Sequence, residues 1–271
     1  MRVIRYLFIA LLVCSTIVNA QTEEDAPEED VSANAQLWID YNIRNSISEK
    51  RFLSAFIGYR SITPHIYNRM VLAPTYHFKQ TKALKLFKIK TPIIHSFQLG
   101  GGLFYTNFFD SPDNFEMRLM QGFQILTPEF KGLYLKNYLR LEQRFQKLLD
   151  NSKWDASMRL RYQLSTVLEW EQTGLPFLKG LYIPLKVEFF FNFSKANRNN
   201  DQIRISPGIG YKFNSLWRAE VSLGYHNSTN TSSIQQTTND VVLRLRVFNS
   251  GDRSSLFKKS KKEQIKDLLE E

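Results

Sequence analysis

The sequence contains a single cysteine, Cys14, which lies within its first twenty residues. No disulfide, thiolate nucleophile or thiolate metal site is therefore expected in the rest of the chain. Beyond the N-terminal segment there is no long apolar run, and a membrane-spanning helix needs about 20 apolar residues. Only 12 glycines and 9 prolines occur in 271 residues, which argues against a low-complexity chain. The low glycine and proline content predicts a folded chain, and the lack of a second long apolar run predicts that it has no membrane-spanning helix.

The formal net charge of +10 is high enough to suggest a nucleic-acid partner. The charged residues, however, fall mostly at alternate positions of strand-like segments and not along one helix or stripe. A secretory leader would also separate the protein from nucleic acid. We therefore expect no nucleic-acid partner. The sequence has no HxH, HExxH or Asp-rich loop, so neither a metal nor a cofactor is expected.

The first 34 residues have the composition of a secretory leader followed by a flexible segment. Two arginines near the start precede an apolar stretch, and residues 18–20 (VNA) form a small-residue cleavage site. Residues 1–20 are therefore expected to be a signal peptide that is cleaved near Ala20. Residues 21–34 are acidic and lack periodicity, which predicts a flexible leader.

An alternation of apolar and charged residues begins at Leu133. Leu139 and Leu141 fall on one side of the pattern, and Arg140 and Glu142 fall on the other. A period of two is typical of a strand with one apolar and one charged face. The pattern recurs through residues 35–248, in segments mostly long enough for tilted membrane strands. It predicts an all-β fold, a transmembrane antiparallel up-and-down β-barrel with apolar side chains outside and polar ones inside.

The pattern contains eleven strand candidates. They lie at about 37–44, 53–60, 66–78, 93–108, 115–127, 132–145, 156–170, 181–193, 202–213, 216–226 and 240–248. Single-chain bacterial barrels have an even number of strands, with short periplasmic turns and long outer loops. We therefore expect twelve strands, the additional one within residues 82–90, or ten if the first candidate lies outside the wall.

The chain beyond the last candidate strand has a different composition. Residues 249–271 are rich in lysine, and their apolar spacing fits a short basic amphipathic helix. With an even number of strands, we expect the leader and this basic tail to lie together in the periplasm.

The charged strand faces form the candidate site, because side chains on the inner face of a narrow barrel fill its lumen. One explanation of these charged residues is structural, because arginine and glutamate side chains on neighbouring strands would pair and fill the lumen. The excess of basic residues also favours attraction of a small anionic solute or a lipid headgroup. The candidate ligand or ion contacts are Arg118, Arg140, Glu142, Arg144, Arg159, Arg161, Lys186, Glu188, Arg204, Arg218, Glu220, Arg244 and Arg246.

Two other functions fit the sequence. A lipid-active hydrolase of the outer membrane would need a serine or threonine beside a histidine, with a third group that orients the histidine. His226 lies near Ser222 and Ser228, but no spacing is diagnostic, so we expect a non-enzymatic barrel without catalytic residues. A soluble periplasmic barrel would point its apolar faces into a ligand cavity. The outward run of Phe189, Phe191 and Phe193 argues against it, because soluble proteins seldom expose so much apolar surface.

Several short motifs occur together between residues 35 and 248. They are Gln36-Leu37-Trp38, Leu139-Arg140-Leu141-Glu142-Gln143-Arg144, Arg159-Leu160-Arg161-Tyr162, Glu188-Phe189-Phe190-Phe191-Asn192, Asp201-Gln202-Ile203-Arg204 and Gly208-Ile209-Gly210-Tyr211. As a set they resemble a family of bacterial secreted proteins, the domain of unknown function number 2490. The resemblance implies an outer-membrane barrel without an assigned activity. The expected partners of this chain are outer-membrane lipid, the barrel-assembly machinery during biogenesis and a small anionic solute.

Overall fold

The computed structural model describes residues 32–48, 50–63, 67–79, 95–109, 111–127, 134–150, 153–169, 180–193, 200–230 and 236–251. The chain divides into the units Met1–Asp30 and Val31–Glu271, and every described residue belongs to the second unit. The expected signal peptide, the tail beyond Gly251 and residues 82–90 lie outside the described ranges. Within those ranges, no helix is long and apolar enough to cross a membrane.

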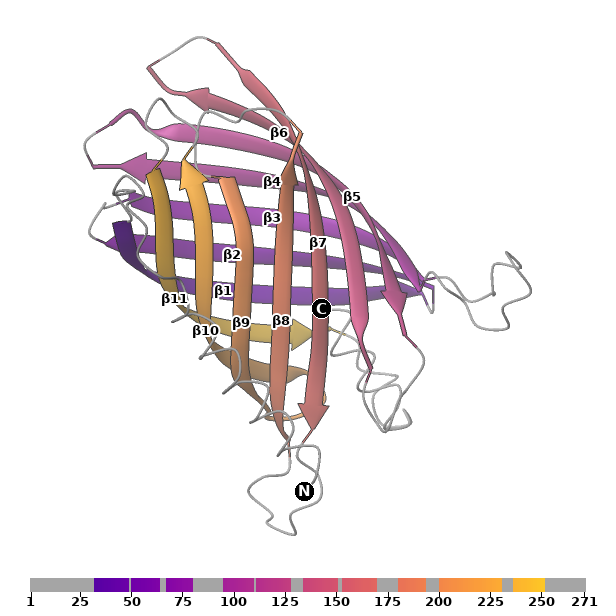
Figure 1. Cartoon of the computed structure of the whole chain (residues 1–271). Coiled ribbons are helices and arrows are strands. Elements are labelled where there is room, and N and C mark those ends of the chain that lie inside the picture. Colours follow the sequence, from indigo (N-terminus) through magenta and orange to yellow (C-terminus); the bar gives the residue numbers. More distant parts are fainter. Residues whose placement is uncertain are drawn as a thin grey trace. The chain divides into compact units, whose positions relative to one another are not determined.

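The described residues form a closed β-barrel, which confirms the predicted all-β fold (Figure 1). Its strands are β1 (Ser32–Ser48), β2 (Arg51–Thr63), β3 (Tyr67–Lys79), β4 (Ser96–Phe108), β5 (Asn114–Leu126), β6 (Lys136–Leu148), β7 (Asp155–Glu169), β8 (Leu181–Asn192), β9 (Asn200–Lys212), β10 (Trp217–Asn230) and β11 (Gln236–Ser250). Each strand pairs antiparallel with the next along the chain, as an up-and-down barrel requires.

The barrel closes through a parallel pair, β1 with β11, which runs from Ser32↔Thr238 to Arg44↔Ser250. The expected strand number of twelve, or alternatively ten, is therefore wrong: the described wall has eleven strands. The first candidate strand belongs to the wall. No strand is inserted after β3, because β3 and β4 pair directly in one continuous register. Strand direction alternates along the chain, so an odd number makes the first and last strands parallel.

The odd strand number places the two ends of the wall at opposite ends of the barrel. We call the end where β1 begins at Ser32 the N-end, and the end where β11 finishes at Ser250 the C-end. The expectation that leader and tail lie on the same side rested on an even strand number. That expectation therefore loses its support.

The two faces of each strand differ as the alternation predicts. Along β5, Glu116 and Gln124 are buried, whereas the intervening Met117 and Leu119 are exposed on the outer surface. Large exposed apolar side chains occur in the same way on every strand except β6, whose outward apolar residues are half-buried. This arrangement is the reverse of a soluble barrel with an apolar ligand cavity, because the apolar face points outward.

Three prolines lie inside strands, although proline removes a hydrogen-bond donor from the sheet. Pro74 pairs with Ala55, Pro184 with Val167 and Pro207 with Leu185. On the other side of each proline the pairing skips two residues and resumes in the same register. The wall therefore accommodates the prolines without a bulge.

Cysteine cross-linking tests the parallel β1–β11 seam. Cysteine pairs at Leu37/Leu243 and at Tyr41/Val247 should each form a disulfide under mild oxidation, because both are direct partners in the parallel register. The background should carry Cys14→Ser, and the shift is read on a denaturing gel.

The exchanged pairs, Leu37/Val247 and Tyr41/Leu243, are the matched controls. In the parallel seam their members are offset by four residues, or about 13 Å at ~3.3 Å per residue, too far for a disulfide. Efficient cross-linking of the exchanged pairs alone would contradict the parallel seam.

Candidate functional site in the barrel interior

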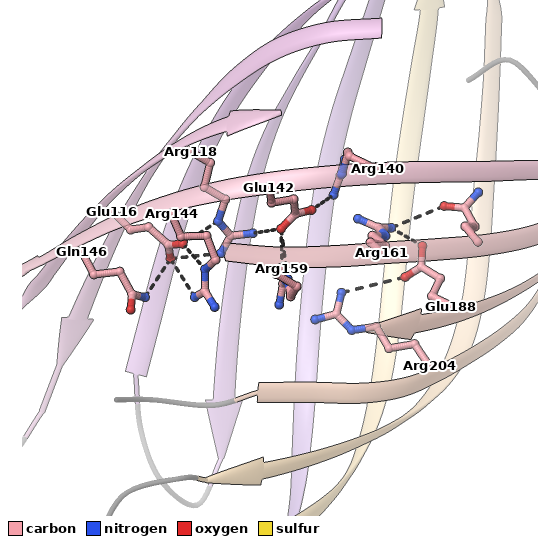
Figure 2. A network of polar contacts seen from close by, with 11 residues as sticks. Glu116, Arg118, Arg140, Glu142, Arg144, Gln146, Arg159, Arg161, Glu188 and Arg204 are labelled. Atoms are coloured by element: carbon pink, nitrogen blue, oxygen red, sulfur yellow. Dashed lines mark hydrogen bonds and ion pairs between the residues drawn. The ribbon is translucent and has the colours of Figure 1, made fainter. Parts of the chain in front are cut away.

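All thirteen predicted site residues lie on strands β5–β11 and belong to the strand faces that point inward. Figure 2 draws the contacts among eleven side chains of the barrel interior, including Gln146 and Glu116. The alternation brings these side chains together, because residues two apart share a face and the strand register sets which of them meet across neighbouring strands.

Glu142 on β6 is the centre of the largest group of contacts. Its side chain has no solvent exposure and accepts a hydrogen bond from Arg140, two residues earlier on the same face. Arg159 is its direct cross-strand partner on β7 and donates through Nη2 over 2.6 Å and through Nε over 3.1 Å. Arg118 Nη1 of β5 lies 3.6 Å from the same carboxylate. One buried carboxylate therefore holds arginines from three strands.

Glu116 on β5 forms a second group. Arg118 Nε and Arg144 Nε each lie 2.6 Å from Glu116 Oε1, and Gln146 Nε2 donates to Oε2 over 3.2 Å. Arg118 is shared, because it also approaches Glu142. The two carboxylates are therefore joined into one network across β5, β6 and β7 (Figure 2).

Further pairs continue the network around the barrel. Glu188 on β8 accepts a hydrogen bond from Arg161 and lies 3.9 Å from Arg204 Nη1 of β9. Glu220 on β10 pairs with Arg246 of β11 and accepts a hydrogen bond of 2.9 Å from the Tyr182 hydroxyl.

Arg218 and Lys186 complete the predicted residues on β10 and β8. The Arg218 Cζ lies 4.0 Å from the centroid of the Phe248 ring. Among the residues that the structure describes, none forms a hydrogen bond or ion pair with Lys186.

Polar side chains also bridge the parallel seam. Asp240 of β11 accepts hydrogen bonds from Asn34 over 2.9 Å and from Gln36 over 2.5 Å, both on β1. In the other direction, Arg244 of β11 lies 2.5 Å from the Asp40 carboxylate of β1. These contacts join residues more than 200 positions apart, so no local pattern indicated them. They add side-chain links to the backbone pairing that closes the barrel.

The interior contains a cavity of about 710 Å³. Ser111 lines it at the N-end, and Arg44 and Asn249 line it at the C-end, so it extends along the barrel. Its charged lining is almost entirely cationic. The lining cations are Arg44, Arg60, Arg69, Arg118, Lys136, Arg140, Arg144, Arg159, Arg161, Lys186, Arg204, Arg244 and Arg246.

Among the described residues, Asp240 is the only carboxylate that lines this cavity. The others lie behind the cations, against the wall: Glu116 is 1 % exposed, Glu142 is 0 % and Asp40 is 1 %. Gly58 makes room for one of them, since a Cβ at that position would lie 2.5 Å from Asp40 Oδ1. The longer arginine side chains extend past the carboxylates that bind them. The cavity surface is therefore positive even where the charges are paired.

Trp38 of β1 is surrounded by guanidinium groups. The Arg60 Cζ lies 3.8 Å from the ring centroid, and the Cζ atoms of Arg204 and Arg244 each lie 5.3 Å from it. His226 approaches the same ring edge-on, with 5.0 Å between the ring centroids. Neither Arg60 nor Trp38 is among the site residues predicted from the sequence. Their proximity depends on how the strands are staggered around the barrel.

The loop between β4 and β5 at the N-end is held by Asp113. This carboxylate accepts hydrogen bonds from the Tyr105 hydroxyl, from Asn107 Nδ2 over 2.9 Å and from the Phe108 amide over 3.3 Å. The hydrogen bond from Tyr105 is the main reason that the pKa of Asp113 lies below its usual range. Ser111 of this loop lines the cavity. The hydrogen bonds to Asp113 therefore fix a loop that lies at the N-end of the barrel.

A serine–histidine contact lies in the same cavity. Ser54 Oγ and His77 Nε2 are 2.7 Å apart, and the His77 ring stacks on Phe52 with 4.0 Å between centroids. The pair lines the interior cavity and not the outer rim, where the predicted lipid-active hydrolase would meet its substrate. The sequence had indicated His226 instead, which packs against Trp38. No group of three metal-ligating side chains is present in the described part of the chain.

The fold and its interior define a closed β-barrel with an apolar outer face and a cationic cavity. The chain belongs to the family of proteins of unknown function DUF2490, whose model matches residues 35–239. The family suggested by the sequence motifs is therefore confirmed. No curated protein and no solved structure matches the chain.

The substitution Glu142→Gln tests whether the buried carboxylate stabilises the wall. It should lower the free energy of unfolding by about 3–5 kcal/mol, because it leaves Arg140 and Arg159 without their buried counter-charge. The measurement is denaturant-induced unfolding of the folded barrel, with Gln143→Leu on the opposite face as the control. A loss below about 1 kcal/mol would show that the arginines do not depend on Glu142.

Proposed function

We propose that this protein is a non-enzymatic outer-membrane β-barrel that binds small anionic solutes in its lumen and provides a narrow passage for them. The observation that carries the proposal is the cavity lining: cations face the cavity, and the carboxylates that hold them lie against the wall. The membrane location rests on a separate observation, the apolar outer surface of the barrel.

The outer surface has the composition of a lipid-facing barrel. Exposed aromatic side chains form one band towards the N-end and another towards the C-end, with aliphatic side chains such as Leu72, Leu119 and Leu223 between them. Aromatic girdles on both sides of an apolar band are typical of outer-membrane barrels. The N-end band contains Tyr59, Tyr105, Trp154, Phe191, Phe193 and Tyr225, and the C-end band contains Phe78, Phe97, Tyr211, Phe213 and Trp217.

The spacing between the bands fits a bilayer. Along β4, Phe97 and Tyr105 are separated by eight residues, about 26 Å along the strand at ~3.3 Å per residue. A strand tilt of about 40° reduces this to about 20 Å across the membrane, near the ~25 Å apolar band of known barrels. So large a contiguous apolar surface is unusual for a protein that faces water on all sides.

The cationic lining favours anions over cations inside the lumen. Rings of arginine and lysine select anions in pores, because a confined positive surface attracts counter-ions and repels cations. A volume of about 710 Å³ lies within the ~300–1,000 Å³ range of small-molecule sites. The positive lining and the volume of the cavity both favour a small anionic solute over a macromolecule as the occupant.

Reconstitution into a planar bilayer tests the passage. With a KCl gradient across the bilayer, we expect conductance steps and a reversal potential shifted towards the chloride equilibrium potential. Arg246→Glu should reduce or reverse this selectivity, because it replaces a cation of the cavity lining with an anion. Lys212→Gln is the control, since Lys212 pairs with Glu169 and is not among the cavity-lining residues.

Absence of conductance steps, or selectivity for potassium in the unmodified protein, would contradict the proposed passage.

A further inference from the structure

We propose that the lumen contains a binding site for a small oxyanion with two negative charges, held between Arg60 of β2 and Lys186 of β8. A dicarboxylate and a phosphate share the required chemistry. The inference rests on the proposed function, because it names the class of anion that the lumen recognises. This inference depends on which individual cations have an ion-pair partner. General attraction of anions by a positive lumen does not depend on this.

Arg60 and Lys186 differ from the other predicted or cavity-lining cations described above. In the described part of the chain, neither side chain has a hydrogen bond or ion pair. Arg60 contacts the Trp38 ring, and its Nε has no hydrogen-bond partner. Both residues line the same cavity. Each is thus a cation that faces the cavity with its donors available.

Three arginines connect these two cations. Arg60 interacts electrostatically with Arg204 and Arg244, and Lys186 interacts with Arg244 and Arg246. All five side chains line the cavity, so their positive charges meet on one surface. We call these five residues the Trp38 cluster, because three of them surround the Trp38 ring.

Two cations of the Trp38 cluster, Arg60 and Lys186, have no ion pair among the described residues. The carboxylates that the contacts of the five cations involve include Asp40, Glu188 and Glu220. Glu188 is shared further, because it also binds Arg161 from outside the cluster. Two cationic side chains without an ion pair in one confined cavity favour an anion with two negative charges over one with a single charge.

The geometry also prepares the cluster for an oxyanion. The Arg60 guanidinium lies 3.8 Å from the Trp38 centroid, a cation–π contact that restricts the orientation of its planar fork. Arg244 is held by Asp40 at 2.5 Å. A guanidinium fork of fixed orientation binds carboxylate or phosphate oxygens with little further loss of side-chain freedom. Lys186, which lines the same cavity, would contribute the second positive charge.

Isothermal titration calorimetry on the folded, detergent-solubilised protein tests the site. The probes are disodium succinate and sodium phosphate at pH 8, with sodium acetate as the single-charge comparison, all at one fixed chloride concentration. We expect saturable binding of succinate, phosphate or both, and binding of acetate at least tenfold weaker. Arg60→Gln and Lys186→Gln should each weaken dianion binding by about tenfold, the effect of losing one charge-assisted contact.

Two controls keep the test specific. Lys212→Gln removes an inward lysine that is not among the cavity-lining residues and should leave binding unchanged. Heat-dependent gel mobility verifies that each variant is folded. Binding of only one of the two dianions would support the site and identify the oxyanion. No saturable binding of either, equal binding of acetate, or unchanged binding in both variants would overturn it.

The outcome is distinguishable from failure of the proposed passage. Anion-selective conductance without dianion binding would overturn this inference and leave the proposed function intact. Dianion binding that depends on Arg60 and Lys186 but occurs without conductance would support the site and contradict the passage.

Discussion

The structure depends on carboxylates that are enclosed by arginines at the inner face of the wall. Glu142 and Glu116 have almost no solvent exposure and bind arginines from three neighbouring strands. Burying such charges without partners would cost several kcal/mol each, so the pairs are what allows a charged strand face to point inward. Because arginine is longer than glutamate, the same pairs leave guanidinium groups facing the cavity. The stability of the wall and the positive lumen thus have one origin.

The second constraint is the closure of an eleven-stranded barrel. An odd number of alternating strands can close only through a parallel pair, and here β1 and β11 form it. Side chains strengthen that seam from both partners, through Asp240 with Asn34 and Gln36, and through Asp40 with Arg244. Arg244 also belongs to the Trp38 cluster, so the seam and the cluster share a residue. Closure of the barrel and formation of the proposed anion site are therefore coupled.

The period-two alternation was sufficient to predict the class of fold, the eleven segments that form the wall and the inward placement of all thirteen site residues. The expected strand number of twelve, or ten, was wrong because it followed from parity, which is an empirical regularity of known barrels and not a property of any one segment. The alternation could not identify Trp38 and Arg60, whose contacts depend on strand stagger. Asp240 meets Asn34 only after closure, across 206 positions of sequence. Contacts within and between adjacent strands follow from pattern and register, whereas contacts across the lumen require the assembled barrel.

We propose that the barrel is inverted, with charged side chains inside and lipid outside. Leu223→Arg, in the middle of the outer face of β10, should lower the unfolding free energy of the protein in lipid vesicles by about 2–4 kcal/mol. Asn45→Arg, on the outer face near the C-end of β1, should cost about 0–1 kcal/mol. This difference with depth is what a surrounding bilayer imposes. Changes within about 0.5 kcal/mol at both positions, as expected for a surface in water, would contradict the account.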